Sequence, residues 1–150
     1  MKPNPRLLDP SIYPHSVEIT TRFSDVDQLQ HLNNSRLAEF YQEARLSFYQ
    51  HLEHAHGYVR RPGSRLLVAH LAIDYLVEVH YPHPVTMRVG LAHIGRTSMT
   101  LAVALFSQGR CGGLAKTVMV YTEGGRPESL PDDFRAILQQ YVMPAELFAD

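Results

Sequence analysis

A helical pattern interrupts a chain that otherwise alternates like a sheet protein. Between residues 33 and 57 apolar side chains recur every three or four positions, as on one face of an α-helix: Leu37, Tyr41, Ala44, Phe48, Leu52 and Ala55. Asn33, Asn34 or Ser35 can cap the start of this helix, and Gly57 is a typical stop. At about 22 residues the helix would be about 33 Å long, enough to lie along a whole sheet.

The segments on both sides of this helix alternate with period two, which predicts strands. The predicted strands cover residues 17–23, 65–79, 85–94, 97–107 and 114–122, and Pro131 opens a short helix. Four prolines within residues 1–14 predict an extended N-terminal arm. Because no linker or repeat divides the rest, residues 15–150 are expected to form one α+β domain with the long helix packed on an antiparallel sheet.

The composition excludes several classes of protein. Lys and Arg total 14 against 15 Asp and Glu, so the chain lacks the basic surface that duplex nucleic acid requires. The single cysteine, Cys111, cannot form an intrachain disulfide or a multi-cysteine zinc site. No run approaches the roughly 18 apolar residues of a membrane span, and the N-terminus has no signal-peptide core. We therefore expect a cytoplasmic protein without a membrane span.

The residues that can carry chemistry gather between a strand end and the helix start. Asp25 and Asp27 lie in this loop, and His31, Asn33 and Asn34 follow. Backbone N–H groups in the first turn of a helix have no intrahelical partner and can stabilise an oxyanion. A carboxylate held beside them could attack a carbonyl or activate a water against it.

The same stretch resembles the opening signature of the hotdog-fold acyl-CoA thioesterases of the 4-hydroxybenzoyl-CoA thioesterase family. The signature residues here are Arg22, Phe23, Asp25, Asp27, His31, Asn33 and Asn34, followed on the helix by Tyr41, Glu43, Ala44 and Arg45. Weaker matches follow in the right order at residues 73–76, 94–98, 125–127 and 130–131. The resemblance runs from about Val17 to Leu138.

This resemblance implies a five-stranded antiparallel sheet wrapped around one central helix, and homodimers or homotetramers with sites at the dimer interface. It implies that Asp27 is the catalytic nucleophile or general base and that the N–H of Asn34 polarises the thioester carbonyl. His31 would position water or hold the loop. The implied substrate-binding residues are Asn33 and, toward the nucleotide of CoA, Arg96, Thr97 and Ser98. Asp25 is expected to hold the loop or pair with Arg22.

Two departures from the family pattern keep other readings open. Gln30 stands where many relatives have glycine before the histidine, and plant acyl-carrier-protein thioesterases of the same fold also tend to have Gln-His there. Residues 81–84 replace a turn that is commonly rich in Gly and Asp. Besides an acyl-CoA thioesterase, the chain could therefore be a carrier-protein thioesterase or a non-catalytic acyl-thioester-binding protein. No cofactor and no metal are expected, since the nine histidines show no set with zinc-ligand spacing.

Overall fold

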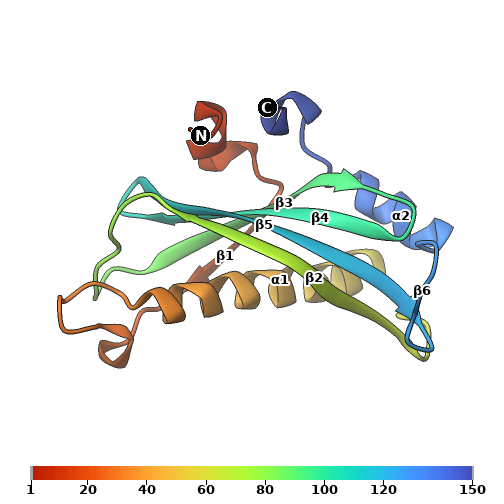
Figure 1. Cartoon of the computed structure of the whole chain (residues 1–150), viewed down its shortest axis with the longest axis horizontal. Coiled ribbons are helices and arrows are strands. Elements are labelled where there is room, and N and C mark those ends of the chain that lie inside the picture. Colours follow the sequence, from red (N-terminus) through yellow and green to blue (C-terminus); the bar gives the residue numbers. More distant parts are fainter. Residues whose placement is uncertain (1, 150) are drawn as a thin grey trace.

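A computed structural model describes residues 2–149 of the chain and shows a single sheet curled around a long helix (Figure 1). The strands are β1 (His15–Ile19), β2 (Ser64–Tyr75), β3 (Val85–Ile94), β4 (Ser98–Ser107), β5 (Arg110–Glu123) and the short β6 (Arg126–Pro127). They pair antiparallel in the order β1-β3-β4-β5-β2, with β6 beside β5. The helices are α1 (Asn34–His56) and α2 (Asp132–Gln139). The predicted α+β fold is confirmed.

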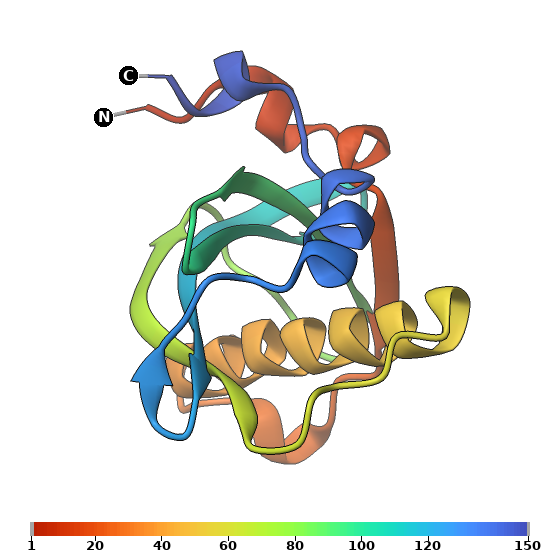
Figure 2. The same ribbon diagram turned by 90° about the vertical axis from the view of Figure 1, so that its right-hand side faces the viewer.

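Helix α1 begins and ends where its sequence predicts. The side chain of Asn33 caps the first turn by accepting a 2.8 Å hydrogen bond from the Ser35 N–H, and Gly57 ends the helix with a left-handed φ of 62°. Helix α1 lies on the concave side of the sheet (Figure 2). The apolar side chains of α1 are buried in the core: Leu37, Phe40, Tyr41, Ala44, Phe48 and Leu52. Burial of this face fixes the helix along the sheet.

Strand β2 forms one edge of the sheet and remains largely uncovered. Across a bulge between Val68 and His70, Val68 lies opposite Met119 and Leu71 lies opposite Thr117. Met119 and Thr117 are buried, so Val68 and Leu71 share the α1 side of the sheet with them. Even so, Val68 is 48% exposed and Leu71 is 40% exposed. The helix therefore covers the centre of the sheet but leaves an apolar strip along β2 without a partner among residues 2–149.

The N-terminal segment corrects one expectation. The predicted extended arm instead forms two short 3-10 helices, Pro5–Leu8 and Pro10–Ile12. Proline suits the first position of such a turn, and the side chains of Asn4 and Asp9 cap the two turns. The segment folds onto the outer face of the sheet beside the C-terminal segment (Figure 2), where both bury apolar side chains: Leu7, Tyr13, Met143 and Leu147.

Other boundaries also differ from the sequence patterns. Strand β5 begins at Arg110, four residues before its predicted start. The first strand ends at Ile19 and not at residue 23, because the chain turns there into the loop that leads to α1. Strand β2 ends at Tyr75, four residues before the predicted end. Between residues 2 and 149, none of the helices combines the length and the apolar character that crossing a membrane would take.

Candidate active site

The loop before α1 holds the carboxylate of Asp27 through backbone hydrogen bonds. One oxygen, Oδ1, accepts from the N–H of Leu29 at 2.9 Å and from the N–H of His31 at 3.2 Å. The N–H of Asp27 in turn donates to the carbonyl oxygen of His31 at 2.9 Å, and Gln30 takes a left-handed φ of 66° to close the turn. The other oxygen, Oδ2, accepts no hydrogen bond from residues 2–149.

Asp25 anchors the same loop, as its sequence position predicts. Its side chain is buried and accepts hydrogen bonds from the backbone N–H of Arg22 at 2.8 Å and from the guanidinium of Arg36 at 2.9 Å. Burial alone would raise the pKa of Asp25, but the hydrogen bonds and charges of Arg22 and Arg36 outweigh it and lower the pKa. Asp25 is thus a charged structural group, whereas Asp27 faces a hollow.

That hollow has a volume of about 370 Å³ and lies between the first turn of α1 and the end of β2. Asp27, His31 and Asn34 line it on the helix side, and Tyr75 and Glu78 line it on the strand side. Asn34 is the first residue of α1, and its N–H donates to no acceptor among residues 2–149. The loop therefore brings together a carboxylate and an unpaired amide at the positive end of a helix dipole.

Asn33 and His31 have structural contacts in addition to their place in the loop. The side chain of Asn33 is the helix cap, and its N–H donates to the carbonyl oxygen of Asp25 at 2.8 Å. The imidazole of His31 pairs with the carboxylate of Glu78 at 3.1 Å.

Arg96, Thr97 and Ser98 lie far from Asp27 within one chain. Their turn joins β3 to β4 at the end of the sheet where α2 lies, whereas α1 begins at the opposite end (Figure 1). Two hydrogen bonds hold this turn: the Arg96 guanidinium donates to the Ser129 hydroxyl at 3.0 Å, and the Gly95 N–H donates to the Ser98 carbonyl oxygen at 2.7 Å. A single chain therefore does not assemble all of the predicted site residues.

Two residues beside the hollow were not predicted from the sequence. Glu78 and His80 follow β2, and their side chains approach each other at 3.6 Å, close to His31. The sequence feature that could have grouped them is the Glu-x-His spacing, because side chains two residues apart lie on the same side of an extended segment. Their meeting with His31, far away in the sequence, depends on the fold.

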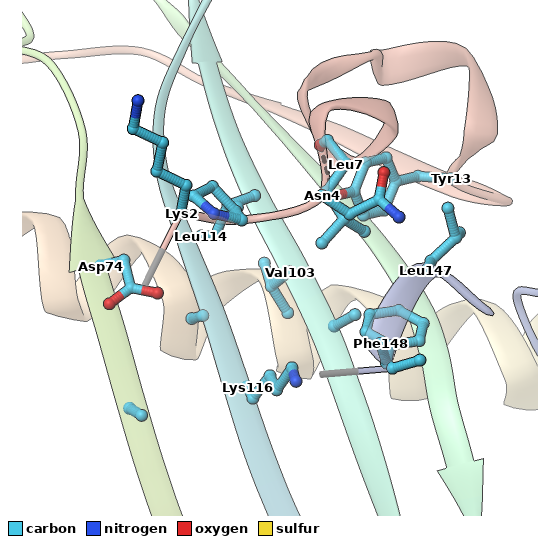
Figure 3. A pocket seen from close by; sticks show the side chains of 15 residues that line it. Lys2, Asn4, Leu7, Tyr13, Asp74, Val103, Leu114, Lys116, Leu147 and Phe148 are labelled. Carbon is cyan, nitrogen blue, oxygen red and sulfur yellow. Dashed lines mark hydrogen bonds between the residues drawn. The ribbon is translucent and has the colours of Figure 1, made fainter. Parts of the chain in front are cut away.

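A second hollow, of about 230 Å³, lies on the outer face of the sheet between the two terminal segments (Figure 3). Tyr13 and Leu147 line it from those segments, while Asp74 and Lys116 line it from β2 and β5. Because the sheet separates it from α1, it shares no wall with the Asp27 hollow.

A curled antiparallel sheet wrapped around one long helix is the hotdog fold. Sequence comparison makes the assignment more specific. The model of the thioesterase-like superfamily matches residues 21–138, so the chain belongs to that superfamily and is a thioester hydrolase by class. Among curated proteins, none matches the chain.

Solved structures support the same fold. The PA5185 protein of Pseudomonas aeruginosa matches with a TM-score of 0.77 at 26% identity, over 92% of this chain and 97% of that protein. A predicted thioesterase from Bacillus stearothermophilus matches with a TM-score of 0.75 at 28% identity, over 86% of this chain and 97% of the other. A thioesterase from Thermus thermophilus, complexed with coenzyme A and zinc, matches with a TM-score of 0.73 at 28% identity, over 86% of this chain and 94% of that protein.

Proposed function

We propose that this protein is an acyl-CoA thioesterase of the 4-hydroxybenzoyl-CoA thioesterase type, which hydrolyses an acyl or aroyl thioester to the free acid and CoA. The observation that carries the proposal is the position of Asp27: its Oδ1 is fixed by two backbone N–H groups, and the whole carboxylate shares one hollow with the N-terminus of α1. The similar Thermus thermophilus thioesterase binds coenzyme A, which favours CoA over other thiols.

The chemistry follows from this arrangement. The thioester carbonyl oxygen accepts a hydrogen bond from the Asn34 N–H, and the helix dipole stabilises the negative charge that develops there. Oδ2 of Asp27 either attacks the carbonyl carbon or removes a proton from the water that attacks it. The C–S bond then breaks, and the CoA thiolate leaves and takes up a proton. In the attack route, water hydrolyses the resulting anhydride and restores the carboxylate.

A second copy of the chain would complete this site. The free edge and the exposed apolar strip of β2 are suited to pairing with the same strand of another copy. If two β2 strands pair antiparallel, the end of one, at Tyr75, lies near the start of the other, at Ser64. The Arg96–Ser98 turn lies at the Ser64 end, because Ser98 pairs with Val120 and Leu67 also pairs with Val120. A homodimer would thus bring that turn of one copy toward the Asp27 hollow of the other, where the guanidinium can bind CoA phosphates.

We also place this activity in the cytoplasm. This part of the proposal rests on the single cysteine, Cys111, because a chain with one cysteine has none of the intrachain disulfides that are typical of oxidising compartments.

A substrate panel tests the proposal. The purified protein is incubated with short, long and aromatic acyl-CoAs, and thiol release is followed with a chromogenic thiol reagent; the same acyl groups are then offered on a carrier protein. Turnover of an acyl-CoA supports the proposal and identifies the acyl class. Turnover of the carrier-protein thioesters alone would show that the substrate is an acyl-carrier-protein thioester and not an acyl-CoA. Binding of acyl-CoA without thiol release from either set would show a non-catalytic binding protein.

A further inference from the structure

Three metal-ligating side chains converge beside the Asp27 hollow. Nε2 of His31 lies 3.1 Å from Oε2 of Glu78, and Nε2 of His80 lies 3.6 Å from the same oxygen. One ligand atom from each of the three residues lies within 4.8 Å of the other two. Ligand atoms on a tetrahedral zinc ion are about 3.4 Å apart, so this separation already approximates a coordination shell.

The backbone holds the two segments that carry these side chains together. The N–H of Leu32 donates a 2.9 Å hydrogen bond to the carbonyl oxygen of Val79. Leu32 follows His31 in the sequence, and Val79 lies between Glu78 and His80. Both Leu32 and Val79 are buried in the core, so the residues next to them are directed outward. The convergence is therefore a consequence of core packing and of a main-chain contact, and it does not depend on the side-chain contact between His31 and Glu78 alone.

We propose that His31, Glu78 and His80 bind a divalent transition-metal ion of the Zn²⁺ class. Two imidazoles and one carboxylate are a ligand set that suits Zn²⁺, Co²⁺ or Ni²⁺, whereas Mg²⁺ and Ca²⁺ prefer shells made of oxygen. Three protein ligands leave at least one position on the ion for water or another ligand.

The place of the cluster gives the ion access to the active site. His31 and Glu78 line the hollow that contains Asp27, while Glu78 and His80 line a neighbouring hollow between the end of β2 and the turn at Gln108. Because Glu78 lines both hollows, an ion bound to it lies beside each of them, and its open position is available to a group that enters either hollow.

Direct metal binding tests this inference without any thioester substrate. The chain is freed of metal with a chelator and titrated at pH 7.5 with Zn²⁺ by calorimetry and with Co²⁺ by visible absorption. We expect one ion per chain and the absorption bands of cobalt bound to nitrogen and oxygen ligands, while Mg²⁺ neither binds nor competes. The variants His80→Ala and Glu78→Gln should each weaken Zn²⁺ affinity by about tenfold or more.

A matched variant separates this site from the other histidines. His54→Ala removes an exposed imidazole from the end of α1 and should leave Zn²⁺ affinity unchanged. Circular dichroism checks that each variant keeps its fold. Absence of saturable Zn²⁺ binding, or binding that persists unchanged in both His80→Ala and Glu78→Gln, would overturn the proposal. Because no readout uses turnover, its failure is distinguishable from failure of the thioesterase proposal.

Discussion

Asp27 and His31 are joined by two hydrogen bonds in opposite directions. The His31 N–H donates to Oδ1 of Asp27 at 3.2 Å, and the Asp27 N–H donates to the His31 carbonyl oxygen at 2.9 Å. The imidazole takes no part in either bond, so main-chain groups alone hold the carboxylate near the N-terminus of α1. The imidazole is left free to contact Glu78 and, in the proposed metal site, an ion.

Closing this loop forces Gln30 into the left-handed region, with φ at 66°. Glycine adopts this conformation without the steric cost that a Cβ adds, which accounts for the glycine at this position in the relatives that the sequence resembles. Gln30→Gly should therefore raise the free energy of unfolding by about 0.5 to 1 kcal/mol in urea titrations. The neighbouring Gln28→Gly, where φ is negative, should lower it. Equal losses in the two variants would contradict this explanation.

Asp25 should contribute to stability more than its small side chain suggests. Asp25→Asn removes the charge that pairs with Arg22 and Arg36, and we expect the free energy of unfolding to fall by about 2 kcal/mol. The exposed Glu128→Gln serves as a control for loss of one negative charge and should have little effect. Chemical denaturation measures both. If Asp25→Asn is as stable as the control, the ion pairs with Arg22 and Arg36 make no net contribution to the free energy of unfolding.

His15 should make the fold sensitive to mild acid. Burial and the nearby His51, whose ring centroid is 4.8 Å away, lower the pKa of His15 to about 4. Because an unfolded histidine titrates near 6.5, the unfolded chain binds the proton first between these values, and stability falls as the pH drops from about 6.5 to 4. A pKa shift of one unit corresponds to roughly 1.4 kcal/mol, and solvent screens part of it. The titration of His15 should therefore change the free energy of unfolding by about 2 kcal/mol over this pH range.

The variant His15→Asn isolates this contribution. Unfolding free energies of the wild type and the variant, measured at pH steps between 4 and 7, should converge as the pH falls, because the variant cannot take up the proton. Parallel curves would show that His15 titrates alike in the folded and unfolded chain.

The uncovered strip of β2 should be the dimer interface. Val68→Lys combined with Leu71→Lys places two charges on this strip, and sedimentation equilibrium should then change from a dimer mass to a monomer mass. Turnover should fall with it, because the Arg96 turn of the second copy is lost from the site. Val59→Lys, at a loop position that is 82% exposed, should remain a dimer and active. A wild type that sediments as a monomer would contradict this assignment.

Local patterns in the sequence predicted most of the fold. The stripe from Leu37 to Leu52 and the caps at Asn33 and Gly57 act within a few residues, so the bounds of α1 followed directly from the sequence. Proline density predicted the N-terminal segment less well, because proline fixes φ but does not decide between an extended chain and a turn. The capping side chains of Asn4 and Asp9 favoured turns there.

The site could be predicted only where its residues are close in sequence. Asp27, Asn33 and Asn34 lie close together in the loop and the first turn of α1, so their grouping required no knowledge of the sheet. Glu78 and His80 reach His31 because β2 ends beside the start of α1, which depends on the strand order. The distance of Arg96 from Asp27 has the same origin, since it depends on the end of the sheet at which each turn lies.

Asp27→Asn determines whether the carboxylate of Asp27 carries out thioester hydrolysis. The substitution keeps the size and the Oδ1 acceptor of the side chain but removes its nucleophilic and basic character. On the best acyl-CoA of the panel, we expect kcat to fall by about 100-fold or more, while CoA affinity, measured by calorimetry, stays at the wild-type value. Wild-type kcat in a folded Asp27→Asn protein would show that a group other than this carboxylate hydrolyses the thioester.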